Sequence, residues 1–178
     1  ANTARTIAAL DGSEVQLTNG AAITGGTFST EGSGVIRSLN TATLDSVTNS
    51  GAFRVSNNTT VTILGTITNS GSILLNSTVN LTDLALGGDV TLNGGGLVSL
   101  LNSARILGVG VLTNVDNTIA GFTTGGGSFG AHAIGIVNQP GALIDANASG
   151  LTLQVDPTRG NGLINDGLSG ARGGGTPP

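Results

Sequence analysis

The sequence contains no cysteine, methionine, tryptophan or tyrosine, and all six of its basic residues are arginine. Charged residues make up 9% of the 178-residue chain, far below the usual fraction of about a quarter. Scattered arginines do not form the basic face that neutralises phosphates, which argues against a nucleic-acid partner. No apolar run approaches the roughly 18 residues that cross a bilayer, so we expect no transmembrane segment. The lack of cysteine fits an extracellular protein that avoids redox chemistry.

The abundant residues are small, polar or strand-forming. The chain has 31 glycines, 24 threonines and 17 asparagines, while apolar residues make up 38% and the formal net charge is −4. This composition is too apolar and too weakly charged for a disordered chain. Helix-forming residues never cluster at helical spacing over a long window, so the sequence predicts an all-β protein.

One short phrase recurs along the chain: an apolar residue, Thr, Asn, a small residue, Gly, another small residue and a second apolar residue. It is clearest at 67–73 and at 47–53, and looser or degenerate copies occur elsewhere. The spacing between copies drifts between 20 and 30 residues. A period of this size on a background of strand-forming residues is typical of a β-solenoid. Each copy has one anchor asparagine, and these are Asn19, Asn49, Asn69, Asn93, Asn114, Asn138 and Asn165.

Each copy reads as a short strand, a turn and another short strand. Thr, Val and Ile favour the pleated backbone, and Asn and Gly tolerate the left-handed conformation of turns. One unit cannot bury its own apolar face, but stacked units form a continuous core. We therefore expect about seven coils, with the anchor asparagines hydrogen-bonded from coil to coil as a structural ladder. The apolar residues expected to stack inward are Val47, Ile67, Leu112, Ile136 and Leu163.

The ends and two internal stretches differ from the regular pattern. We expect residues 1–13 to be an N-terminal cap or an exchanged segment, 14–170 to be the solenoid, and 171–178 to be a Gly/Pro tail. Residues 6–10 fit either a short helix or a first strand. The apolar run at 104–113 suggests two buried strands that meet at a glycine bend, and the five glycines of 121–130 suggest a loop outside the coil.

Residues for catalysis are scarce. Stacking brings some of Asp83, Asp89, Asp116 and Asp145 together, but Asp also commonly fills turns. One histidine, His132, without cysteine does not make a metal site. We expect no enzyme and no cofactor, with a weakly bound structural calcium ion as the alternative. Thr-x-Thr triplets present both hydroxyls on one strand face, but they do not recur at the coil period, which favours a solvated surface over an ice-binding one.

Two segments, 112–121 (Leu-Thr-Asn-Val-Asp-Asn-Thr-Ile-Ala-Gly) and 136–146 (Ile-Val-Asn-Gln-Pro-Gly-Ala-Leu-Ile-Asp-Ala), resemble repeats of very large secreted bacterial proteins. These are the autotransporter-type and filamentous-haemagglutinin-like adhesins, and the resemblance covers roughly residues 14–168. It implies a right-handed parallel β-helix. It also implies an exported protein that acts in adhesion, surface coating or biofilm.

Together these features predict a secreted structural protein of the bacterial surface or extracellular matrix. Low charge removes the repulsion that keeps solenoid ends apart, and uncapped ends favour stacking. We therefore expect a homo-oligomer, most simply a filament of subunits joined end to end. The alternatives are an adhesin module that binds glycans or host or abiotic surfaces, a polysaccharide-active β-helix enzyme, and an ice-binding protein.

Overall fold

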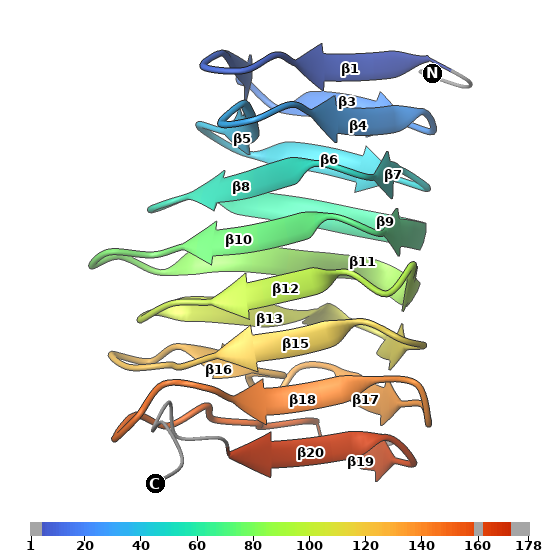
Figure 1. The fold of residues 1–178 in the computed structure, drawn as a ribbon. Coiled ribbons are helices and arrows are strands. Elements are labelled where there is room, and N and C mark those ends of the chain that lie inside the picture. The colour runs from blue at the N-terminus through green and yellow to red at the C-terminus, as the bar shows by residue number, and fades with distance from the viewer. Residues whose placement is uncertain (1–4, 159–161, 172–178) are drawn as a thin grey trace, which may run out of the picture.

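The computed structural model describes residues 5–158 and 162–171. Every regular element in these ranges is a β-strand, and the strands pair only in parallel. They stack along one axis as a rod, from β1 at one end to β20 at the other (Figure 1). The predicted fold class, an all-β parallel β-helix of about seven coils, is confirmed.

The chain visits three faces in turn in each coil, and two of them belong to a 12-stranded sheet. Face 1 contains β1 (Thr6–Ala9), β4 (Thr27–Thr30), β7 (Thr48–Asn49), the second half of β9 (Thr60–Asn69), the second half of β11 (Thr82–Asn93), β14 (Val111–Asn114), β17 (Gly135–Asn138) and β19 (Leu163–Asn165). Face 3 contains β3 (Ala21–Thr24), β6 (Ala42–Asp45), the first halves of β9 and β11, β13 (Ala104–Val109) and β16 (Ser128–Phe129).

Face 2 is a separate 8-stranded sheet. It contains β2 (Glu14–Leu17), β5 (Val35–Ser38), β8 (Ala52–Ser56), β10 (Ser72–Asn76), β12 (Leu97–Leu100), β15 (Thr118–Gly121), β18 (Leu143–Ala146) and β20 (Leu168–Ala171). Faces 1 and 3 form one sheet because β9 and β11 continue around the corner between them. The bend in β9 lies at Gly65, whose φ is 64°. In β11 the register with β9 shifts between Leu86 and Val90.

The predicted glycine bend at 104–113 is confirmed, since β13 and β14 occupy this run with Gly110 between them at φ 89°. The loop expected at 121–130 is shorter than predicted. The chain leaves the strands only at 122–127, and Ser128–Phe129 returns as β16. Phe129 is fully buried and pairs in register with Ile106, so apolar burial returns this part of the segment to the coil.

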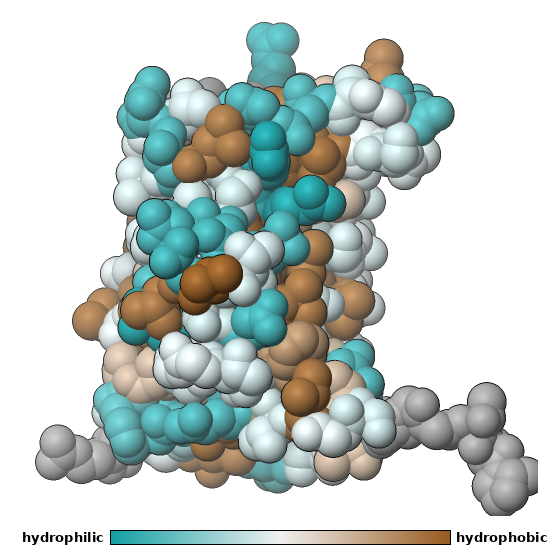
Figure 2. Space-filling view, turned by 90° about the vertical axis from the view of Figure 1, so that its left-hand side faces the viewer, coloured by the Kyte–Doolittle hydropathy of each residue, from teal (hydrophilic) through white to brown (hydrophobic). Residues whose placement is uncertain are grey.

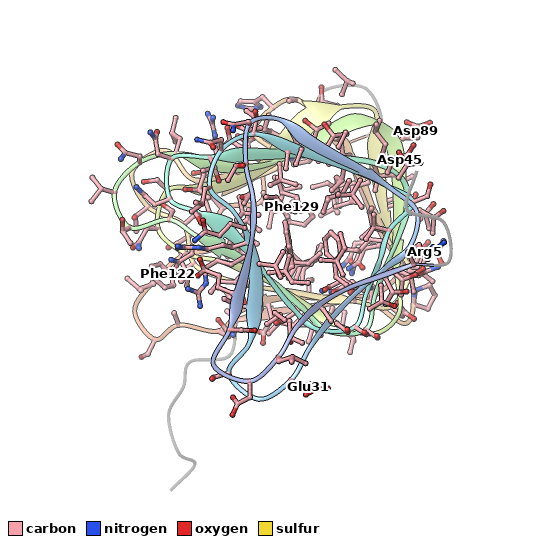
Figure 3. The ribbon with its side chains drawn as sticks, turned by 90° about the horizontal axis from the view of Figure 1, so that it is seen from above. Arg5, Glu31, Asp45, Asp89, Phe122 and Phe129 are labelled. Carbon is pink, nitrogen blue, oxygen red and sulfur yellow. The ribbon has the colours of Figure 1, made fainter. Side chains whose placement is uncertain are left out.

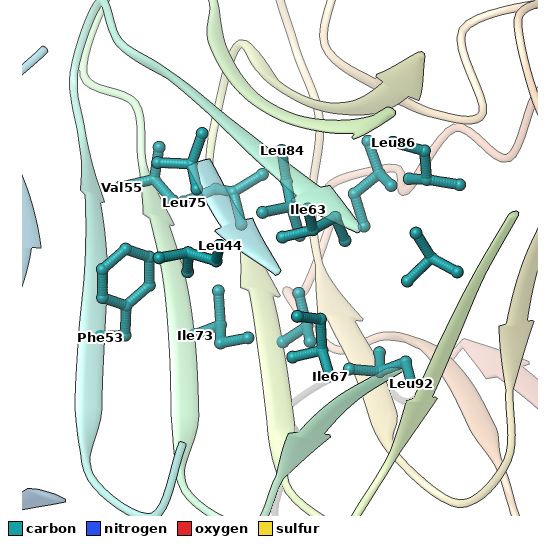
Figure 4. Packing of buried hydrophobic residues seen from close by; sticks show 14 of the residues in the cluster. Leu44, Phe53, Val55, Ile63, Ile67, Ile73, Leu75, Leu84, Leu86 and Leu92 are labelled. Carbon is teal, nitrogen blue, oxygen red and sulfur yellow. The ribbon is translucent and has the colours of Figure 1, made fainter. Parts of the chain in front are cut away.

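The core is a set of apolar columns, because alternate residues of each strand point inward and the coils stack about 4.8 Å apart. On face 3 one such column follows the register through Val61, Leu84, Ile106 and Phe129. Figure 4 shows how these columns interlock with those of the other faces. Viewed down the rod, Phe129 lies in the interior, whereas Glu31, Asp45 and Asp89 point outward (Figure 3).

Four of the five apolar residues predicted to stack inward are buried, namely Val47, Ile67, Leu112 and Ile136. Leu163 pairs in register with Ile136 but is 42% exposed, because no described residue lies below its coil.

The N-terminal segment forms a strand, so the helical reading of residues 6–10 is wrong. Thr6–Ala9 is β1, and it pairs residue for residue with β4 of the same chain. In this chain it is the first strand of face 1. Residues 1–4, within the predicted 1–13 segment, and 172–178, within the predicted tail, lie outside the described residues.

Candidate functional site

Five of the seven predicted ladder asparagines lie along the corner between faces 1 and 2. Each is the last residue of its face 1 strand. They are Asn49, Asn69, Asn114, Asn138 and Asn165. The middle three are fully buried, Asn49 is 3% exposed, and Asn165 is exposed in the last described coil. Buried amides need hydrogen-bond partners, so their partners determine how the coils are held together.

The asparagine side chains bond directly from coil to coil. Asn49 Nδ2 donates to Asn69 Oδ1 at 2.8 Å, and Asn138 Nδ2 donates to Asn165 Oδ1 at 2.8 Å. Asn114 Nδ2 donates to Asn138 Oδ1 at 3.1 Å. Asn49 and Asn138 each also donate to a main-chain carbonyl of the following corner, Ser72 O at 3.1 Å and Leu168 O at 3.2 Å respectively. Each such amide therefore joins two coils through both side chain and backbone.

The ladder prediction is wrong for Asn19 and Asn93. Asn93 pairs in register with Thr68, one residue before the ladder position, and this single-residue offset turns its side chain to the opposite side of the strand. Gly94 lies opposite Asn69 instead. Asn19 is exposed at the corner between faces 2 and 3, where Asn19 and Gly20 both have positive φ, 55° and 74°. Asn19 and Gly20 therefore form a tight turn instead of a ladder position.

Asn117, absent from the predicted ladder, joins its two halves. Its Oδ1 accepts a hydrogen bond from Asn69 Nδ2 at 2.9 Å, and its backbone N–H donates to Asn114 Oδ1 at 3.1 Å. Asn117 is fully buried. The spacing of three residues between Asn114 and Asn117 could have indicated that Asn117 belongs to the ladder. The repeat phrase, however, contains only one asparagine in each copy.

Three glycines, 94–96, allow Asn69 to reach past the intervening coil. A Cβ atom on Gly96 would lie 2.5 Å from both Asn69 O and Gly71 O and 2.7 Å from Asn69 Nδ2. A side chain there would occupy the path of the Asn69 amide. The close approach of Asn69 therefore requires glycine at 94 and 96, whereas Gly95 would have room for a Cβ and instead has the left-handed φ of 71° that favours glycine.

Three of the four aspartates considered for catalysis, Asp83, Asp89 and Asp116, act between coils, and the fourth, Asp145, is buried in β18. Asp83 forms a bidentate pair with Arg105, with Oδ1 2.8 Å from Nε and Oδ2 2.8 Å from Nη2. This carboxylate raises the pKa of Arg105. Asp89 and Asp116 accept backbone N–H groups of Val111 and Gly95 in the next and preceding coils, both at 3.0 Å. These carboxylates hold corners together and do not converge on a cavity.

His132 lies on the surface, as expected, with its side chain 80% exposed. Its Nδ1 is 3.0 Å from Asp156 Oδ1. Among the described residues, no group of three or more His, Cys, Asp or Glu side chains is arranged to hold a metal ion.

Single threonines recur at the coil period on face 1, whereas the prediction concerned only Thr-x-Thr triplets. Face 1 carries two columns in register on its outer surface: Thr6, Thr27, Thr48 and Thr68, and Thr66, Thr91 and Thr113. The columns are ragged, since Asn93 follows the first and Val137 follows the second. They were missed because most members do not belong to Thr-x-Thr triplets.

Asp11 links the first two coils and makes part of the stability acid-sensitive. Its Oδ1 accepts from Ser33 N–H at 2.8 Å and from Ser33 Oγ at 2.9 Å. These bonds, the backbone one first, hold the pKa of Asp11 below its ordinary value. Because the folded pKa is depressed, the contribution of Asp11 to stability is present above the unfolded pKa of about 3.9 and is lost as the pH falls through the folded value.

We expect Asp11→Asn to flatten the decline in melting temperature below about pH 4. An acid decline identical to that of the wild type would contradict this assignment.

The last described coil leaves part of the core open. A hollow of about 340 Å³ is lined by Ile144, Ala146, Leu153, Val155 and the 169–171 segment. Leu163, Ile164 and Leu168 beside it are 42%, 48% and 65% exposed. β19 and β20 each pair with a strand on one side only, so their other edges carry unpaired backbone groups within the described structure.

Within the described ranges, no helix could serve as a membrane span. No family model, curated protein or solved structure matches this chain.

Proposed function

We propose that this chain is a non-catalytic structural solenoid of the bacterial surface or extracellular matrix, and that its subunits stack end to end into a filament. The observation that carries the proposal is the open apolar edge formed by β19, β20 and the hollow above them. An exposed strand edge beside an uncovered core favours the addition of another coil.

The first coil, at the other end of the rod, has the free strand edges and apolar side chains that such a contact needs. β1 and β2 pair only with β4 and β5, and β3 only with β6, so this coil also presents three free strand edges within the described residues. Its inward side chains Ile7, Val15 and Ile23 are only half-buried. In a parallel stack the two edges are complementary, because each coil pairs with the next in the same direction. The contact is heterologous and does not close, so it gives an open polymer.

The buried polar groups support a structural role. Asn49, Asn69, Asn114 and Asn138 hydrogen-bond along the rod axis. The Asp83–Arg105 pair likewise joins neighbouring coils. Location outside the cell is proposed from the resemblance to secreted adhesins and from the lack of cysteine.

Leu163→Asp tests the proposal, because it places a charge on the open apolar edge. For the wild-type 178-residue chain we expect a molecular mass that rises with concentration in light scattering, and rods in electron microscopy. Leu163→Asp is expected to keep the β-rich circular dichroism spectrum and to remain monomeric.

The matched control is Val79→Asp, which adds the same charge at an apolar side chain that is 78% exposed. Val79 lies in a loop between β10 and β11, halfway along the rod (Figure 1). This side of the molecule shows hydrophobic and hydrophilic side chains interspersed (Figure 2). Val79→Asp is expected to polymerise like the wild type. A monodisperse wild-type monomer at high concentration would refute the proposal.

A further inference from the structure

The outer surface of face 2 carries an unusual pair of arginines. Arg37 of β5 and Arg54 of β8 lie directly opposite one another in the parallel register. Neighbouring strands are about 4.8 Å apart. Like charges in this position repel and destabilise a sheet. The pair therefore needs a compensating negative charge.

The protein supplies only part of that charge. Glu14 Oε1 is 2.9 Å from Arg37 Nε. The pKa of Glu14 is lowered mainly by the hydrogen bond from Gln16, and to a smaller extent by Arg37 and then by Arg54. Two guanidinium groups thus share one carboxylate. Arg105, by contrast, has the carboxylate of Asp83 to itself. The strands β2, β5 and β8 of face 2 therefore carry two positive charges against one negative charge, on a chain whose net charge is −4.

Hydrogen bonding at this place is also incomplete. Arg37 Nε, Arg54 Nε and Ser56 Oγ are buried polar atoms without a hydrogen-bond partner. The 2.9 Å contact of Arg37 Nε with Glu14 lies off the N–H direction, so it is an ion pair without a directed hydrogen bond. Ser56 follows Arg54 by two residues and shares the outer side of β8. Arg54 Nε and Ser56 Oγ thus lack a hydrogen-bond partner beside Arg37, whose Nε has only its ion pair with Glu14, and unpaired buried polar atoms are costly.

We propose that the surface formed by Arg37, Arg54 and Ser56 binds the oxyanion groups of an acidic polysaccharide. A carboxylate or sulfate group offers several acceptors and a negative charge, and guanidinium forks pair with such groups in a bidentate way. The side chains of Arg37 and Arg54 are partly exposed, so their forks are able to turn toward a ligand that supplies the missing acceptors. The site is independent of end-to-end assembly, because it lies on the side of the rod.

The surroundings favour a polysaccharide over a peptide. β5 and β8 are interior strands of face 2, each paired on both sides, so they offer no free edge to a peptide strand. The neighbouring outward positions are occupied by Gln16, Leu74 and Ala52 of adjacent paired strands. A continuous sheet face that carries two neighbouring guanidinium groups fits an extended polymer that lies across several strands, whereas small molecules generally bind in concave pockets.

Matched pairs of polymers test the site on the full chain at low salt. Polygalacturonate is compared with its methyl ester, and dextran sulfate with dextran, by biolayer interferometry. We expect saturable binding of at least one acidic polymer and no binding of its neutral partner. Binding should weaken as salt is added, because the contact is electrostatic. Whichever acidic polymer binds more tightly identifies carboxylate or sulfate as the preferred oxyanion, and either result supports the site.

Variants locate the binding. Arg54→Gln and Arg37→Gln are each expected to weaken it by about tenfold or more, as the loss of a charge-assisted hydrogen bond does. Arg105→Gln makes the same change in net charge at an arginine that is already paired, and it is expected to bind like the wild type. Melting curves check that each variant is folded at the assay temperature.

Three results would overturn the proposal: no binding of either acidic polymer, equal binding by all the variants, or equally tight binding of polyglutamate. The net charge of −4 disfavours unspecific attraction of a polyanion, so binding that is lost in Arg54→Gln is specific to this surface. None of these outcomes depends on the oligomeric state, so failure here is distinguishable from failure of the assembly proposal.

Discussion

Asn69→Ala is expected to destabilise the fold by about 3 kcal/mol or more, because it removes the central link of the asparagine ladder. The Asn69 amide is fully buried, accepts from Asn49, and donates to Leu97 O and Asn117 Oδ1. Alanine leaves these groups without a partner in a place that water does not reach. Each buried group left unsatisfied costs about 1–3 kcal/mol. Urea unfolding followed by circular dichroism measures the difference.

The matched control is Asn93→Ala, at the same position of a neighbouring repeat phrase. Asn93 is half-buried, outside the ladder, and its Oδ1 has no hydrogen-bond partner. Its replacement is expected to change the free energy of unfolding by less than about 1 kcal/mol. Equal effects of the two substitutions would show that the ladder does not contribute the stability assigned to it.

Gly96→Ala is expected to have an effect of similar size for a steric reason. The new Cβ would lie 2.5 Å from two carbonyl oxygens and 2.7 Å from Asn69 Nδ2. Backbone oxygens of a paired coil cannot withdraw without breaking coil-to-coil hydrogen bonds, and overpacking of this kind typically costs about 1–3 kcal/mol. Loss of the Asn69–Asn117 bond adds to this cost. We therefore expect a loss of about 3 kcal/mol in total, measured by the same unfolding experiment.

Gly88→Ala is the control for this substitution. A Cβ on Gly88 would meet no atom within 4 Å, and its φ lies outside the left-handed region. Alanine there is expected to be neutral or to stabilise the fold by up to about 1 kcal/mol, since it restricts the unfolded chain. If Gly96→Ala melted at the same temperature as Gly88→Ala, the close approach at Gly96 would not matter for stability.

The fold was predictable because the coil is short and its signals repeat. Apolar residues at matching places in successive phrases specified which side of each strand faces inward, and Ile67, Leu112 and Ile136 are indeed buried. The choice between helix and strand for residues 6–10 was not predictable from local propensity. It was decided by pairing with β4, whose residues lie about twenty positions later.

The ladder was only partly predictable, because the same short phrase has two structural uses. Asn69 ends a face 1 strand and points inward, whereas Asn19 occupies a left-handed turn at another corner. Local sequence does not distinguish them, since a shift of one residue reverses the direction of a strand side chain. The role of Asn117 depended on glycines in another coil, which only the three-dimensional stacking brings beside it. The arginine surface was missed for the same reason, because Arg37 and Arg54 become neighbours only through strand pairing.

The hydrogen bond from Asn69 to Asn117 across the glycines at 94–96 also has a mechanical consequence. In a rod whose coils touch only their neighbours, tension along the axis peels coils away one after another. Here the Asn69 amide hydrogen-bonds to Asn117, two coils further along the rod. The coil that contains residues 94–96 lies between them, so this bond links the coils on either side of it. We therefore expect those three coils to resist pulling as one unit and to release a longer length of chain when they yield.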